Sequence, residues 1–239
     1  AANHVVMLRN TSKGHSLYTT FQLQKNFVDG ILKGLYLNGS YSFGQSRGVT
    51  DGTSSVATSA WKYRAALDGN AEEVGYTAGS FDGRLLLSAS YTANWSKYAA
   101  TSFGLIYQRY RPFRYSYCYN GDANGDSQFS NDLMYIPANF DEVKDHLLPG
   151  DFDSQEDAWK AMNAFIEQDP YLSKHRGEYA ERNGAVAPFA NQLDLSVSHD
   201  IKIYQKNGRS HTLRFSFNIA NFLNLLNRNW GVVQTTVLG

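Results

Sequence analysis

"RLLLSASYTANW", residues 84–95, decides the fold because its side chains alternate in character at every second position. One set is apolar and comprises Leu85, Leu87, Ala89, Tyr91, Ala93 and Trp95. The other is mainly polar and comprises Leu86, Ser88, Ser90, Thr92 and Asn94. A period of two belongs to a β-strand, whose successive side chains point to opposite faces of a sheet. The stretch therefore predicts a strand with one apolar face and one polar face.

Five further segments carry the same alternation, at 16–25, 35–44, 102–113, 192–203 and 212–221, with 102–113 the least regular. Their polar positions hold mainly Ser, Asn, Gln and Thr, with occasional charges. That composition is typical of a hydrated barrel interior, whereas a soluble β-sandwich usually presents Lys, Glu and Thr to water. The apolar positions, with aromatic residues near strand ends, match a lipid-facing surface. The sequence thus predicts an all-β fold, an antiparallel up-and-down transmembrane β-barrel segment.

The connections between these segments fall into two classes of length. Residues 26–34, 96–101 and 204–211 are short and rich in turn residues, and two much longer segments lie between the hairpins. Outer-membrane barrels have short periplasmic turns and long extracellular loops. The pattern therefore predicts a long extracellular loop at 120–190.

A helix is predicted inside that loop, near 154–168. Ser154 is placed to cap it with Asp157 three residues on, and Pro170 ends it. Its apolar face comprises Ala158, Trp159, Met162, Phe165 and Ile166. An apolar helix face must be covered, so we expect it to pack on the barrel mouth or on a partner.

Composition excludes several classes of protein. The 22 Lys and Arg residues balance 22 Asp and Glu residues, so no basic field attracts nucleic acid. No run approaches the roughly 20 consecutive apolar residues of a membrane helix, and the start, "AANHVVMLRN", is no signal peptide. The single cysteine, Cys118, excludes an intrachain disulfide and a multi-cysteine metal cluster. Its aromatic surroundings favour a packed thiol over a reactive one.

The stretch "NGDANGD", residues 120–126, carries oxygen-bearing side chains at alternate positions. They are Asp122, Asn124 and Asp126, with Asp132 further on. A calcium loop of the EF type places ligands at positions 1, 3, 5 and 12 and Gly at position 6. Counted from Asp122, position 6 is Ser127 instead of Gly. Asp132 comes one place before position 12, which is Leu133. Two interpretations stay open: turns that satisfy their own backbone, or a bound Ca²⁺ in the 120–132 loop.

Motifs of catalysis are missing from the sequence. The six histidines show no metal-ligand spacing, and there is no serine elbow, Walker loop or dinucleotide fingerprint. Acidic pairs such as Asp141 and Glu142 fall in loops, where they are solvated charges. We therefore expect no enzyme activity.

Four stretches are long and ordered enough to carry a family resemblance. They are "YNGDANGD" from Tyr119, "NDLMYIP" from Asn131, "AFIEQDPYLSKHRGEYAERNGAVAPFANQLDLSVSHDI" from Ala164 and "HTLRFSFNIANFLNLLNRNWG" from His211. Together they resemble the C-terminal barrel region of TonB-dependent outer-membrane receptors, in the Oar-like, SusC-related branch. The resemblance implies a barrel of about 22 strands closed by an N-terminal plug. It also implies a place in the bacterial outer membrane and a functional link to the TonB complex.

The chain departs from that family plan. Residues 1–239 offer only six strand candidates, no plug and no final strand, so we expect a partial C-terminal receptor barrel. Six strands leave two open edges, which lipid does not tolerate. The expected partners are therefore the remainder of the barrel and the plug, on the same or other chains. Membrane lipid, the TonB complex and a surface lipoprotein lid complete the expected set.

The resemblance implies a transporter that imports a bulky nutrient, such as an oligosaccharide, a peptide or a chelate. The residues expected to face its lumen are Tyr36, Asn38, Ser40, Asn94, Asp194, Ser196, Asp200, Arg214 and Asn218. Two alternatives stay open. One is a non-transporting outer-membrane scaffold or adhesin-like protein, and the other is a free-standing soluble β-sandwich.

Overall fold

The computed structural model describes residues 7–52, 54–204 and 210–235. Its main sheet is antiparallel and open, with the strand order β1-β2-β4-β5-β10-β11, and β3 pairs with β2. The strands are β1 (Gly14–Asn26), β2 (Leu35–Gly48), β3 (Gly75–Tyr76), β4 (Phe81–Asn94), β5 (Ala99–Tyr110), β10 (Ala190–Tyr204) and β11 (Ser210–Ile219). All six segments that alternate in sequence are strands, in agreement with the all-β expectation.

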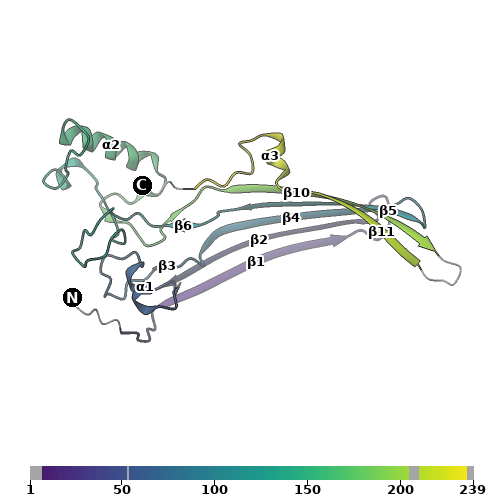
Figure 1. Cartoon of the computed structure of the whole chain (residues 1–239), viewed down its shortest axis with the longest axis horizontal. Coiled ribbons are helices and arrows are strands. Elements are labelled where there is room, and N and C mark those ends of the chain that lie inside the picture. Colours follow the sequence, from purple (N-terminus) through teal and green to yellow (C-terminus); the bar gives the residue numbers. More distant parts are fainter. Residues whose placement is uncertain (1–6, 53, 205–209, 236–239) are drawn as a thin grey trace. The chain divides into compact units, whose positions relative to one another are not determined.

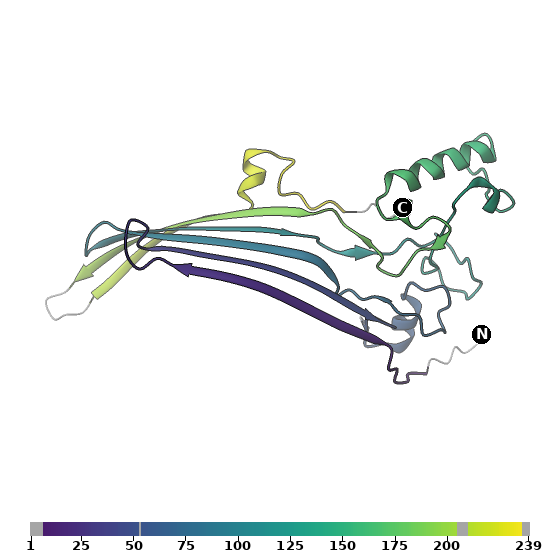
Figure 2. The same cartoon turned by 180° about the vertical axis from the view of Figure 1, so that it is seen from behind.

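The chain divides into two compact units. The sheet unit comprises Leu17–Gly44, Phe81–Pro112 and Ala187–Gly239, and the loop unit comprises Ala1–Ser16, Gln45–Ser80 and Phe113–Val186. The long strands of the sheet unit lie side by side in both views of the ribbon (Figures 1 and 2). The two long connections predicted from the sequence thus supply most of the loop unit.

Short turns join the strands of the first two hairpins. In the first, the Phe27 N–H donates to the Leu35 carbonyl at 2.9 Å. In the second, the Trp95 N–H donates to the Ala99 carbonyl at 3.0 Å, so β5 begins at Ala99 rather than at Ser102 as expected. β5 ends before Pro112, which lacks the N–H that a ladder requires. In the third connection, residues 205–209 lie outside the described residues.

The loop unit contains short elements between irregular segments. They are α1 (Ala57–Lys62), β6 (Arg114–Tyr115), β7 (Tyr135–Ile136), η1 (Phe140–Glu142), α2 (Gln155–Gln168), η2 (Leu172–Lys174), β8 (Glu178–Tyr179) and β9 (Ala185–Val186). Two pairings tie them together, since β6 pairs with β9 and β7 pairs with β8. In the part of the chain that the structure describes, no helix is long and apolar enough to cross a membrane.

α2 confirms the predicted loop helix and its cap. The Ser154 hydroxyl accepts the Asp157 N–H at 3.1 Å and donates to the Asp157 carboxylate at 2.8 Å. Lys160 Nζ donates to the same carboxylate at 2.9 Å, which together with the Ser154 bond lowers the pKa of Asp157. The helix begins and ends within a residue of the predicted bounds because these signals are local in sequence.

Part of the apolar face of α2 packs against other segments of its own loop, while Phe165 on that face is 44% exposed. Packing of the remainder on the barrel mouth or on a partner stays a prediction. Ile136, Ile166, Leu172 and Ala180 form a buried cluster in the loop unit. Partly buried residues packed against it are Tyr117, Met134, Met162 and Tyr171. The Tyr117 hydroxyl donates to the Asp169 carboxylate at 2.6 Å, and burial together with this bond raises the tyrosine pKa. The loop unit forms a small buried core of its own because several separate segments contribute residues to it.

Candidate functional site

The polar face of the sheet unit collects all nine residues that the sequence assigned to a lumen. Strand register places side chains on a common face when they are paired partners in adjacent strands. One such row is Tyr36, Ser90, Gly104, Ser196 and Asn218. The others are Asn38, Ser88, Ile106 and Asp194, then Ser40, Leu86, Gln108 and Gln192, then Asn94, Ala100, Asp200 and Arg214. The predicted residues therefore share one surface.

Neutral hydrogen bonds link neighbouring strands across this face. Gln22 Nε2 donates to Asn38 Oδ1 at 3.0 Å, and Gln108 Nε2 donates to Gln192 Oε1 at 2.9 Å. Further hydroxyl contacts join Thr20 to Ser42 at 2.9 Å and Thr92 to Ser102 at 3.0 Å. A face of this composition offers amide and hydroxyl groups to a solute and carries little net charge.

Two carboxylates of the polar face have defined hydrogen-bond partners. Arg214 donates through Nε and Nη2 to the two oxygens of Asp200, at 2.6 and 2.7 Å. Asp194 Oδ1 accepts the Gln192 amide at 3.0 Å and the Asn221 N–H at 2.8 Å. The Asn221 bond lies beside α3 (Phe222–Leu226), so Asp194 also fixes the segment that follows β11.

Several members of this face were left out of the expected lumen set. Thr20, Gln22, Gln24, Thr92, Gln108 and Gln192 take part in its hydrogen bonds. The same alternation could have added them, because each occupies a position on the polar face of its strand. Arg84, which donates to Gln108 at 2.9 Å, extends the face toward the end of the sheet that bears the long connections.

The opposite face of the sheet is apolar across five strands. One unbroken row is Leu35, Tyr91, Phe103, Val197 and Phe217. The next is Leu37, Ala89, Leu105, Leu195 and Ile219. Several of these side chains are exposed in the described structure, with Phe217 65% and Phe103 45% exposed. An exposed apolar surface of this extent is typical of a site that another apolar phase or protein covers.

A buried arginine organises the loop unit. Arg182 is only 5% exposed, and its guanidinium donates to main-chain carbonyls of Gly48, Val49, Gly75 and Tyr76. The bond to Val49 is 2.5 Å long, and Asn183 adds a bond to the Tyr76 carbonyl at 2.8 Å. Burial lowers the pKa of Arg182. Because its acceptors lie in residues 45–80, Arg182 fastens that segment to residues 113–186.

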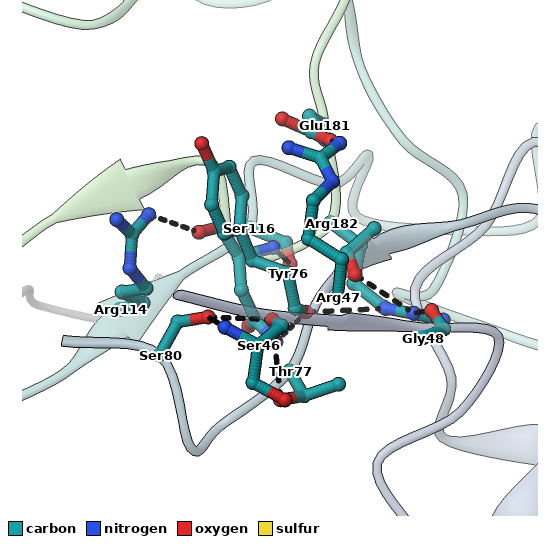
Figure 3. A network of polar contacts seen from close by, with 12 residues as sticks. Ser46, Arg47, Gly48, Tyr76, Thr77, Ser80, Arg114, Ser116, Glu181 and Arg182 are labelled. Carbon is teal, nitrogen blue, oxygen red and sulfur yellow. Dashed lines mark hydrogen bonds and ion pairs between the residues drawn. The ribbon is translucent and has the colours of Figure 1, made fainter. Parts of the chain in front are cut away.

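Aromatic and ionic contacts surround this arginine (Figure 3). The Tyr76 ring lies between two guanidinium groups, with Arg47 4.3 Å and Arg114 4.1 Å from its centroid. Arg47 also forms an ion pair with Glu181. The sequence held no signal for this cluster, because its members are far apart along the chain and its main acceptors are backbone carbonyls.

The 120–132 loop folds as turns that satisfy their own backbone. The Asp122 carboxylate accepts N–H groups of Gly125, Asp126 and Ser127, at 2.7, 3.0 and 2.9 Å. Asp132 Oδ2 accepts the N–H groups of Ala123 and Asn124, Asp126 Oδ1 accepts that of Gln128, and Asn124 Oδ1 accepts that of Asp126. Among the described residues, no group of three or more His, Cys, Asp or Glu side chains could hold a metal ion.

Calcium binding in this loop stays a prediction, tested by calorimetry on the intact protein. Heat that Asp122→Ala abolishes would support the site. Asp141→Ala is the matched control, because that carboxylate is 82% exposed and lies outside the loop. No heat at millimolar Ca²⁺ would remove the calcium interpretation.

Cys118 is a packed thiol in the loop unit. Burial raises its pKa to about 11, and the nearby Asp132 carboxylate adds to the shift. A raised thiol pKa favours the neutral form, so the reactive thiolate is scarce at pH 8. We expect iodoacetamide to alkylate Cys118 at least about 100-fold more slowly in the folded protein than in the urea-unfolded chain, since each pKa unit removes about tenfold of the thiolate. Similar rates, measured by mass spectrometry, would contradict this expectation.

The comparisons with known proteins found no match, whether among protein-family models, curated proteins or solved structures.

Proposed function

We propose that the chain forms part of the wall of a TonB-dependent transporter in the bacterial outer membrane. The polar face of the sheet would line a hydrated lumen, and the apolar face would meet lipid. The observation that carries the proposal is the register, which separates the two kinds of side chain across at least four adjacent strands. Lipid supplies a cover for an exposed apolar face without a second protein layer.

The placement of the connections supports the same orientation. In an antiparallel sheet, the long connections after β2 and β5 leave from one end, and the short turns after β1 and β4 lie at the other. Outer-membrane barrels segregate extracellular loops and periplasmic turns in this way. In this proposal the long connections are extracellular loops, and the buried cluster within them lets them hold a defined surface.

The edges of the sheet indicate what must complete the wall. Among the described residues, β1 and β11 stand at the two ends of the strand order, so each forms an edge of the sheet. Unpaired groups in hydrocarbon cost several kcal/mol each, about 2–7 by transfer scales. Additional strands, on the same or other chains, would close the barrel around a plug.

The resemblance to SusC-related receptors supplies the proposed mechanism. Extracellular loops would capture a bulky nutrient, such as an oligosaccharide, a peptide or a chelate, and the TonB complex would pull on the plug. The polar face would then offer exchangeable hydrogen bonds along the route. Paired charges such as Asp200 and Arg214 would keep that route close to neutral.

Uptake measurements in cells test the proposal. We expect the protein in the outer-membrane fraction, and we expect deletion of its gene to abolish uptake of one class from a panel of oligosaccharides, peptides and ferric chelates. Loss of TonB should abolish the same uptake. Outer-membrane location with unchanged uptake would instead favour the scaffold or adhesin-like protein. A chain that stays soluble and folded without detergent would favour the β-sandwich.

A further inference from the structure

Two consecutive hairpins of the sheet unit carry the same pairing of a lysine with an aromatic ring. In the first, Lys25 Nζ lies 5.7 Å from the centroid of the Phe27 ring. In the second, Lys97 Nζ lies 4.9 Å from the centroid of the Tyr98 ring. Both pairs lie at the end of the sheet that bears the short turns. A cation near a ring face is held by the ring quadrupole, so each pair keeps a positive charge at the level of an aromatic side chain.

The apolar face at this end terminates in an anchored tryptophan. Trp95 aligns with Ala99 in the β4–β5 ladder, and Ala99 aligns with Ile201 on β10. The indole Nε1 donates to Thr101 Oγ1 at 2.7 Å, and that hydroxyl contacts His199 Nδ1 at 2.8 Å. The ring itself remains 67% exposed. Tryptophan with an apolar body and an anchored polar edge is typical of a membrane–water interface.

The first short turn combines exposed apolar side chains with lysines. Ile31 is 99% exposed, and Val28 and Leu32 are exposed beside it. Lys25 and Lys33 flank these side chains in sequence. Apolar and cationic groups at one level suit the boundary between acyl chains and headgroups, because both can be satisfied there at once.

The two described short turns hold more cationic than anionic side chains. In the two described short turns and the strand ends beside them, the sequence has three lysines, Lys25, Lys33 and Lys97, and one carboxylate, Asp29. The nearby Asp200 is engaged by Arg214 on the polar face. The surplus of cations beside aromatic rings complements an anionic surface rather than a cationic or apolar one.

We infer that the short-turn end of the apolar face binds anionic phospholipid headgroups, with Lys25 and Lys97 at the phosphates and Trp95 at the boundary below. This inference rests on the proposed function, because it requires the apolar face to meet a bilayer. It adds to that function a chemical preference of the periplasmic end for anionic over zwitterionic lipid. The phosphate of a lipid headgroup is the anion that occurs at the depth of interfacial rings.

Native mass spectrometry of the intact protein in detergent tests the preference. Phosphatidylglycerol and phosphatidylcholine with identical acyl chains are the two probes. We expect phosphatidylglycerol to bind at least about fivefold more, the factor that roughly one lysine near an anionic surface contributes. The double variant Lys25→Gln/Lys97→Gln should lower the ratio well below the wild-type value, with Lys33 as the lysine that remains. Lys62→Gln is the matched control and should leave it unchanged, because Lys62 Nζ lies 5.6 Å from the Tyr63 ring but belongs to α1 of the loop unit.

A fluorescence measurement keeps the inference testable if the double variant folds poorly. Brominated phosphatidylglycerol should quench the wild-type protein more than brominated phosphatidylcholine does, and Trp95→Phe should remove that difference. Equal binding of the two lipids by the wild type would overturn the inference, and so would a double variant that keeps the wild-type ratio. Insertion into pure phosphatidylcholine vesicles separates the two proposals. Insertion without lipid preference overturns this inference alone, and failure to insert into any bilayer overturns both.

Discussion

Val197→Lys is expected to be among the most damaging single changes in the sheet unit, lowering the free energy of unfolding by about 2–4 kcal/mol in a bilayer. Val197 lies on β10 between Phe103 of β5 and Phe217 of β11, on the apolar face. If that face meets lipid, a lysine there must place its ammonium group in hydrocarbon or distort the bilayer to reach water. That cost is largest for a site near the midplane of the membrane.

The matched control is Ser198→Lys, one position further along the same strand. Ser198 pairs with Ser102 and Ser216 on the polar face, so its replacement puts the same charge into the proposed lumen. We expect a change within about 0.5 kcal/mol there, as for a surface substitution. Urea unfolding of the protein in vesicles, or the folded fraction on an unheated gel, measures both variants. Equal losses in the two variants would contradict the assignment of the faces.

The sheet could be predicted from the sequence because its signal is local. A strand with two unlike environments shows a period of two whatever its neighbours are. The least regular strand, β5, illustrates the limit of that signal. Ile106 lies in a polar row and Arg109 in an apolar row, so the alternation is broken at both positions. The pairing of β5 with β4 and β10, rather than its own sequence, places its first residue at Ala99.

The loop unit could not be predicted beyond α2, for a physical reason. The cap and apolar stripe of α2 lie within one segment, whereas its cover comes from Ile136, Leu172 and Ala180 in other segments. No periodicity links such residues, because their proximity is set by tertiary packing. The hydrogen bonds of Arg182 are harder still to predict, since their acceptors are main-chain carbonyls, which have no sequence signature. The candidate lumen face could be predicted for the opposite reason. The alternation of side chains along each strand is enough to assign a residue to that face.

Leu172→Ala is expected to lower the local stability of the loop unit by about 2–5 kcal/mol. Leu172 is fully buried, with 0% of its surface exposed, and it packs with Ile136, Ile166 and Ala180. Truncation removes apolar contacts and leaves a cavity, because main-chain bonds tether the chain on both sides and limit collapse. One such bond joins the Ser173 N–H to the Asp169 carbonyl at 3.1 Å. The cluster is small, so no second layer replaces the lost contacts.

Hydrogen exchange of the α2 amides measures this loss, because α2 contributes Ile166 to the cluster. If exchange requires local opening, a loss of 2 kcal/mol accelerates it by about 30-fold and a larger loss by more. Leu148→Ala is the matched control, since it deletes the same atoms from a side chain that is 81% exposed. That variant should leave α2 exchange within about twofold of wild type. Unchanged exchange in Leu172→Ala would mean that the cluster does not hold the helix. Acceleration confined to Leu172→Ala would establish that the loop unit carries a working core of its own, independent of whatever covers the apolar face of the sheet.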